Sequence, residues 1–403
     1  MAPYESDDAQ GAERGEEARS GRRTAARYAV PVAVVGVAAA TIGLVPALAD
    51  SGDPDLPRIT AQQLIQKIAA SDVQQLSGTV KVGTDLGLPD LGGLGSGITS
   101  GMTRGAGSGS AADPQARLTE LVTGTHTLRV AADGPDRQKL SLVEQGAEYS
   151  VIHNGKDVWG YDSKSHQVSH GTAPVGKDRR AEPPATPKDF ADEALKSVDD
   201  TTSVTVDGTV HVAGRDAYKL LIKPRQSGTT VGAISIAVDA RTGMPLKFTL
   251  TPKSGGAAVL DAGFTEVSFA RPAASTFAFT PPEGAKVTER EDAPGKGADR
   301  PGKGLEGIQG KGLEGAAGPT VLGKGWTSIA TFDTGAKGGL PTGAKGGDAA
   351  GFLGSLGEKV SGRFGKGTVF STRLVNALIT DNGKVYAGAV TKDALVKAAD
   401  AGK

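Results

Sequence analysis

In residues 118–170 and 203–280 of this chain, apolar and polar residues alternate with a period of two, which predicts half-buried β-strands. In residues 125–130, for example, Leu128 and Val130 fall on the same face of a strand. An Asn-Gly pair at 154–155 and an Asp-Gly pair at 207–208 have the composition of hairpin turns. Because strand follows strand without a helix between each pair, the pattern favours an antiparallel sheet or barrel over a parallel α/β fold.

Two stretches show helical spacing instead. Thr60 can cap a helix in which Leu64 and Ile68 share a face. Thr186 can cap a second, short helix that has Pro187 at its first position. Strands with one helix before them and another between them predict a mainly β fold with helices (α+β), curved into a half-barrel.

The C-terminal residues 323–403 predict a further small α+β unit, near the size at which one core is marginal. We expect a strand over residues 325–332 and a short helix over residues 352–360. A hairpin follows around an Asn-Gly pair at 382–383, and Thr391 can cap a last helix.

The N-terminal pattern predicts export. Residues 1–27 are polar and end with several arginines, and residues 28–49 carry no charge. The uncharged stretch is long enough to span a bilayer and ends in the small residues Ala47-Leu48-Ala49 that signal peptidase accepts. It is therefore either a signal peptide cleaved near Ala49 or a transmembrane anchor, with residues 1–27 cytoplasmic. Both alternatives place the remaining chain outside the cytoplasm.

Composition changes this picture at three points. The 45 basic and 45 acidic residues cancel, which excludes a strong electrostatic case for nucleic acid. The absence of cysteine excludes disulfides, thiolate metal sites and a lipidated-cysteine anchor. The 59 glycines concentrate in residues 83–113 and in linkers, including residues 289–322 between the two folded parts.

The glycine-rich stretch 83–113 contains apolar residues, unlike a plain polar linker. Two hypotheses stay open: a disordered insertion between neighbouring strands, or a lid over an apolar cavity. The lid residues would be Leu88, Leu91, Leu94, Ile98 and Met102.

The sequence offers no catalytic constellation, so we expect no enzyme, no cofactor and no metal site. His166 and His170 are four apart but lie in loop or strand sequence, where this spacing does not bring side chains together. No Gly-x-Ser-x-Gly motif and no marked acid–base pair occurs. The two GKGLEG repeats at 302–307 and 310–315 have no strand before them, which argues against nucleotide binding.

The apolar strand positions are the remaining candidate site. Together they predict a lipid-sized apolar groove on the concave face of the half-barrel, although each of them alone is an ordinary core position. The predicted lining residues are Leu128, Val130, Leu142, Trp159, Tyr161, Ile236, Val238, Leu246 and Phe248.

Four stretches within residues 58–288 resemble the LolA/LppX/RseB group of bacterial lipoprotein-carrier-like proteins. They are TAQQLIQKIAASDVQQLSGTVKV, YSVIHNGKDVWGYDSKSHQV, the pair VAGRDAYKLLIKP and VDARTGMPLKFTL, and FAFTPPEGAKV. The pair is similar to the RseB/MucB branch. The resemblance implies an unclosed antiparallel β-barrel covered by helices, with an apolar cavity for acyl chains. The long loop 83–113 and residues 323–403 depart from the family pattern.

This resemblance implies an extracytoplasmic protein that binds lipid or lipoprotein, as a carrier or acceptor in the cell envelope. The alternative that it implies is an RseB-like envelope-stress sensor that regulates an anti-sigma factor by protein–protein binding. The expected partners are thus acyl chains of lipid or lipoprotein and an anti-sigma or other envelope membrane protein.

Overall fold

The computed structural model describes residues 53–87, 124–172, 186–289, 320–333 and 357–402 of the chain. The chain divides into two compact units, residues 1–52 and residues 53–403. The first unit, with the predicted signal or anchor 28–49, lies outside the described residues, as do the predicted lid residues. No helix among the described residues has the length and hydropathy of a membrane span.

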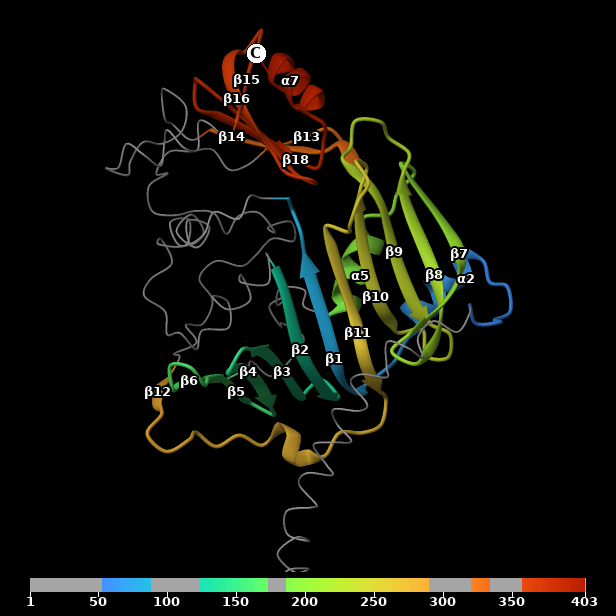
Figure 1. Cartoon of the computed structure of the whole chain (residues 1–403), viewed down its shortest axis with the longest axis vertical. Helices are drawn as coiled ribbons and strands as arrows, with labels where there is room; N and C mark the ends of the chain where they lie inside the picture. The colour runs from blue at the N-terminus through green and yellow to red at the C-terminus, as the bar shows by residue number, and fades with distance from the viewer. Residues whose placement is uncertain (1–52, 88–123, 173–185, 290–319, 334–356, 403) are drawn as a thin grey trace, which may run out of the picture. The chain divides into compact units, whose positions relative to one another are not determined.

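A twelve-stranded sheet dominates the fold, and it consists of two runs of consecutive antiparallel strands (Figure 1). The first run is β1 (Gln75–Thr84), β2 (Gly124–Asp133), β3 (Arg137–Glu144), β4 (Ala147–Asn154), β5 (Asp157–Asp162) and β6 (Gln167–Thr172). The second run is β7 (Thr202–Val212), β8 (Arg215–Pro224), β9 (Val231–Asp239), β10 (Pro245–Pro252) and β11 (Leu260–Ser268). The predicted turns at 154–155 and 207–208 fall differently: the first joins β4 to β5, and the second is a bulge within β7.

The two runs meet where β1 pairs with β11, across 191 residues of sequence between Ser77 and Ser268. A short twelfth strand, β12 (Lys286–Glu289), then returns to the far edge and pairs with β6 in parallel. The strand order begins at β12 and ends at β7, and these two edges do not pair with each other among the described residues. The sheet is therefore unclosed. Together with the predominance of strands over helices, this confirms the expected mainly β, α+β fold class.

Two helices lie on one face of the second run. Helix α2 (Ala61–Ala69) and helix α5 (Pro187–Lys196) both begin with capping boxes, at Thr60 and Thr186, as the sequence predicts. Their buried residues join Leu220, Ile236 and Phe248 of the sheet in one hydrophobic cluster. These residues are Leu64 and Ile68 of α2 and Ala191 and Ala194 of α5.

A second, six-stranded sheet forms the C-terminal part, and helix α7 (Lys392–Ala401) packs against it. Its order is β13 (Thr320–Leu322), β14 (Ile329–Asp333), β18 (Lys384–Gly388), β17 (Asn376–Thr380), β16 (Gly365–Ser371) and β15 (Glu358–Gly362). The helix predicted over residues 352–360 is wrong at its described end, because Val360 lies in β15 and pairs with Gly367. Antiparallel pairing with β16 overrides the helical spacing of the apolar residues there.

Backbone hydrogen bonds join the second sheet to the loop between β8 and β9. The Thr230 amide donates to the Ala389 carbonyl at 3.0 Å, and the Thr391 amide donates to the Gly228 carbonyl at 2.8 Å. The Trp326 indole also donates to Thr202 Oγ1 at 2.8 Å. The small sheet therefore does not depend on its own core alone.

Candidate functional site: the apolar face of the large sheet

Directly paired residues of antiparallel strands point to the same face of a sheet, so the register defines an apolar face. One row of paired residues crosses the first run: Val80, Leu128, Leu142 and Tyr149. Another crosses the second run: Val82 of β1, Ala262, Phe248, Ile236 and Leu220. Because Val80 and Val82 lie two apart in β1, both rows belong to one continuous apolar face.

Helices cover the two halves of this apolar face unequally. Under α2 and α5, Leu220 and Ile236 are completely buried. Across β2, β3 and β4, a further row of paired residues, Val130, Leu140 and Val151, remains half-buried. We name these three side chains, together with half-buried Leu76 of β1, the open row. The open row is the candidate binding surface, since no described part of the chain buries its aliphatic side chains as completely as their neighbours.

The position of β1 that pairs with the open row is a glycine. Gly78 of β1 pairs with Val130, so β1 contributes no side chain at this register position. A Cβ at this position would lie 2.3 Å from the Glu266 carbonyl oxygen and 3.0 Å from the Phe264 ring. The glycine therefore allows the β11 backbone to approach β1 closely.

The predicted lining residues separate into three groups in the structure. Leu128, Leu142 and Leu246 belong to one buried cluster, and Val130 packs at its border. Ile236, Val238 and Phe248 belong to the cluster under the helices. The remaining two, Trp159 and Tyr161, pair with Ile152 and Ser150 and so lie on the opposite face.

On that opposite face, Trp159 and Tyr161 pack against Phe279, with ring centroids 5.5 and 5.7 Å apart. Phe279 follows the short 3-10 helix η2 (Ala274–Phe277) in the segment that leads from β11 to β12. The alternation of residues in β5 predicts that both aromatic rings share a face of the sheet. Which face they share is determined by the pairing register of β5 with β4.

Leu76, Leu140 and Val151 of the open row are not among the lining residues that the sequence pattern predicts. The signal was present, because Leu140 and Val151 keep the same alternation as Leu142 and Tyr149. These residues are distinguished from Leu128 and Leu142 only by their exposure, which depends on contacts with distant strand residues such as Val212 and Leu246 of the same buried cluster.

An open cavity of about 540 Å³ lies on the opposite face, and its lining includes Arg129, Lys139, Ser141, Glu148 and Glu266. The Ser150 hydroxyl donates to Glu148 Oε1 at 2.7 Å, and Ser141 Oγ lies 2.8 Å from Ser150 Oγ. Burial acts to raise the pKa of Glu148, but the serine hydroxyls, Lys139 and Arg129 outweigh it and hold this pKa below its ordinary value. The carboxylate is therefore ionised, and its charge is stabilised within the sheet surface.

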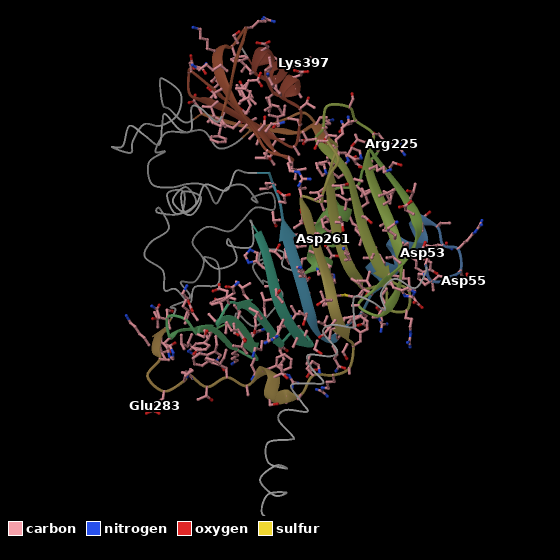
Figure 2. The ribbon with its side chains drawn as sticks, in the orientation of Figure 1. Asp53, Asp55, Arg225, Asp261, Glu283 and Lys397 are labelled. Atoms are coloured by element: carbon pink, nitrogen blue, oxygen red, sulfur yellow. The ribbon has the colours of Figure 1, made fainter. Side chains whose placement is uncertain are left out.

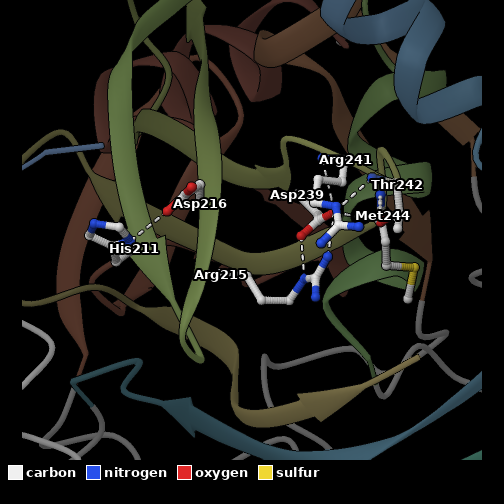
Figure 3. A network of polar contacts seen from close by, with 7 residues as sticks. All are labelled: His211, Arg215, Asp216, Asp239, Arg241, Thr242 and Met244. Carbon is white, nitrogen blue, oxygen red and sulfur yellow. Dashed lines mark hydrogen bonds and ion pairs between the residues drawn. The ribbon is translucent and has the colours of Figure 1, made fainter. Parts of the chain in front are cut away.

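A polar network around Asp239 closes the end of the β9–β10 hairpin (Figure 3). Asp239 is 1% exposed, and Oδ1 accepts hydrogen bonds from the Thr242 amide at 2.7 Å and the Arg241 amide at 3.1 Å. The Arg215 guanidinium, at the start of β8, contacts both carboxylate oxygens. Burial acts to raise the pKa of Asp239, but Arg215 and Thr242 outweigh it and lower this pKa. Because residues of the chain itself supply hydrogen-bond donors to both carboxylate oxygens of Asp239, we interpret the network as structural.

The histidine and carboxylate side chains of the described ranges do not gather into a metal site. Among the described residues, no group of three His, Asp or Glu side chains is arranged to hold a metal ion. His166 and His170, the spaced pair of the sequence, lie in different elements: His166 has a positive φ of 53° before β6, and His170 lies inside β6.

No family model matches the sequence, and no curated protein matches it. Among solved structures, the chain is similar to the MucA/MucB complex of Pseudomonas aeruginosa, with 16% identity over 84% of this chain and 96% of that one and a TM-score of 0.38. A LolA superfamily protein from Nitrosomonas europaea shows 10% identity over 55% of this chain and 99% of that one, with a TM-score of 0.21. An uncharacterized conserved protein from Thermus thermophilus shows 13% identity over 57% of this chain and 99% of that one, with a TM-score of 0.31. The likeness to LolA- and MucB-type proteins is one of fold.

Proposed function

We propose that the protein binds the acyl chain of a lipid or lipoprotein along the open row, as a carrier or acceptor outside the cytoplasm. The observation that carries this proposal is the half-buried row itself: aliphatic side chains in register across three adjacent strands, next to a fully packed half of the same face. Three inter-strand steps from β1 to β4 span roughly 14 Å at ~4.8 Å each, the scale of an extended acyl chain.

The energetics favour an apolar occupant. Burying each methylene group of a ligand against such a row contributes ~0.8 kcal/mol, so a chain of several methylenes gains enough to offset the cost of being held. The open row itself carries no charged side chain, since its members are Leu76, Val130, Leu140 and Val151. A charged group of a ligand would gain no binding free energy from contact with the open row. A hydrocarbon tail would gain binding free energy there.

The location of the function outside the cytoplasm rests on residues 28–49, which are uncharged and long enough for export. We propose that this segment either anchors the chain or is cleaved near Ala49. Amino-terminal sequencing of the protein from its membrane and soluble fractions distinguishes an anchored protein from a released one.

The binding proposal is tested with parinaric acid, a fatty acid whose fluorescence rises when its chain enters an apolar site. Leu140→Asn and Val143→Asn are matched variants, because both residues lie in β3, both are half-buried, and their side chains point to opposite faces. We expect Leu140→Asn to weaken binding at least fivefold and Val143→Asn to leave it unchanged. Equal effects of the two variants, or no binding to the unmodified chain, would refute the proposal.

A further inference from the structure

The last strand of the large sheet is attached in an unusual way. Strand β12 runs parallel to β6, whereas β5 pairs with β6 in antiparallel fashion on its other side. Its four residues are all exposed, and Val287 is 44% exposed although it is apolar. None of the four belongs to a hydrophobic cluster. A four-residue parallel strand without core contacts adds little stability from its ladder alone.

Among the described residues, one side-chain contact fastens β12, and it requires a charged histidine. His170 Nδ1 lies 2.8 Å from Glu289 Oε2 of β12, and His170 Nε2 lies 2.9 Å from Asp157 Oδ1 of β5. Carboxylate oxygens of ionised side chains only accept hydrogen bonds, so both ring nitrogens must donate. A neutral imidazole has one N–H, and therefore this arrangement exists only with the imidazolium.

The surroundings of His170 favour that charge. The Trp159 ring stacks on the imidazole, with centroids 3.8 Å apart and planes at 18°, and an aromatic face attracts a cation. The hydrogen bond to Asp157, with that to Glu289, raises the pKa of His170 above its ordinary value, against the opposing effect of burial. Asp157 of β5 and Glu289 of β12 are the charged groups that the described structure places against the ring.

Within the described residues, β12 covers the β6 edge from Gln167 to His170, while β5 covers the other edge of β6. When β12 detaches, this edge presents unpaired backbone groups. Such an edge is a template for another strand, and an extended peptide that adds to it gains main-chain hydrogen bonds.

We propose that the β6 edge is a docking site for an extended peptide strand of a partner protein with a carboxylate opposite His170, and that β12 occupies this site as an exchangeable segment of the same chain. The peptide that fits has the pattern of β12 itself: an aliphatic residue opposite Val168 and an acidic residue two positions later, opposite His170. Exchange costs the chain little, because β12 contributes no buried side chain.

The test uses the full chain and the labelled hexapeptide Ala-Lys-Val-Thr-Glu-Arg, which copies residues 285–290. Lys286→Pro removes the backbone donor of β12 that bonds the His166 carbonyl at 3.0 Å, and so opens the edge. At pH 6 we expect this variant to bind the hexapeptide at least tenfold more tightly than the unmodified chain. A hexapeptide with Gln in place of its Glu should bind the variant at least tenfold more weakly. Equal binding of both chains or of both peptides overturns the proposal.

A second set of variants keeps the test independent of the proline. Glu289→Gln leaves the β12 backbone intact, and we expect faster amide hydrogen exchange in residues 286–289. His170→Gln should abolish the preference for the acidic hexapeptide. The matched control is His211→Gln, since His211 faces a single carboxylate, that of Asp216, at 2.9 Å. An unchanged preference in His170→Gln, or an equal loss in His211→Gln, overturns the role of His170.

The pH dependence has a defined sign. The pKa of His170 is raised in the folded chain, so the interaction with a carboxylate is fully present below the ordinary histidine pKa. It is lost as the pH rises through the folded-state pKa. Binding of the hexapeptide should therefore weaken as the pH rises through the pKa of His170, and the Gln peptide should show no such change. Parallel pH profiles of the two peptides contradict the proposal.

Discussion

Replacement of Asp239 by asparagine tests whether the network of Figure 3 holds the β7–β8 and β9–β10 hairpins together. Asparagine keeps the shape, and its carbonyl oxygen can still accept from the Thr242 and Arg241 amides that now bind Oδ1. Its amide group must then replace Oδ2, where it meets the Arg215 Nε donor. The change therefore removes the negative charge of the nearly completely buried Asp239 from its pair with Arg215 and sets two hydrogen-bond donors against each other.

The magnitude follows from this geometry. Breaking a buried ion pair costs ~3–5 kcal/mol, and we expect Asp239→Asn near the lower end because Arg215 is 22% exposed and water can partly solvate it. Asp239→Ala should cost more, since it also leaves the Thr242 and Arg241 amides without their acceptor, at ~1–3 kcal/mol for each buried group. The predicted order of stability is thus unmodified chain, Asn variant, Ala variant.

Urea unfolding of the full chain, followed by far-UV circular dichroism, measures both changes. The matched control is Asp261→Asn in β11 (Figure 2), because Asp261 pairs with Lys247 at 3.0 Å but both side chains are 42% exposed. An exposed pair of this kind contributes ~0–1 kcal/mol. If Asp239→Asn and Asp261→Asn destabilise the chain equally, the buried network does not have the role that we assign to it.

Three further predictions concern the packing and its pH dependence. Leu64→Ala empties a fully buried position of α2 and should lower the free energy of unfolding by ~2–5 kcal/mol in urea titrations. Gly78→Ala places a Cβ 2.3 Å from a backbone oxygen of β11, so it should lower the thermal midpoint more than Gly83→Ala, whose nearest atom is 3.8 Å away. Because the pKa of Asp239 is lowered in the folded chain, its stabilising effect is present at neutral pH and lost as the pH falls through the folded-state pKa. Acid titration of the unmodified chain should therefore show a loss of stability that Asp239→Asn lacks.

Local features of the fold follow directly from the sequence. Thr60 and Thr186 cap the two helices of the large sheet, since a threonine hydroxyl can accept from an amide of the first turn. The Asn-Gly pair at 154–155 joins β4 and β5, because its backbone accommodates a tight turn. In each case the cause lies within a few residues, where sequence pattern is informative.

Features of the fold that depend on contacts between residues distant in sequence cannot be predicted from the local sequence pattern. Pairing of β1 with β11 and addition of β12 to β6 join segments far apart in sequence, and neither is visible in local alternation. For the same reason the sequence does not predict the placement of Trp159 and Tyr161 away from Leu128, because a period of two fixes which residues share a face but not which face is covered. The binding role of the predicted lining residues stays a prediction.

The pairing of β1 with β11 also sets the order in which the sheet can form. Each run of consecutive strands can form from neighbours along the chain, whereas Ser77 must wait for Ser268 before the two runs join. Contacts of such long sequence separation are slow to form. During synthesis, the edge of β1 that pairs with β11 is therefore unpaired until most of the chain has emerged. A binding factor that shields this edge would protect the protein from aggregation at the stage when it is most vulnerable.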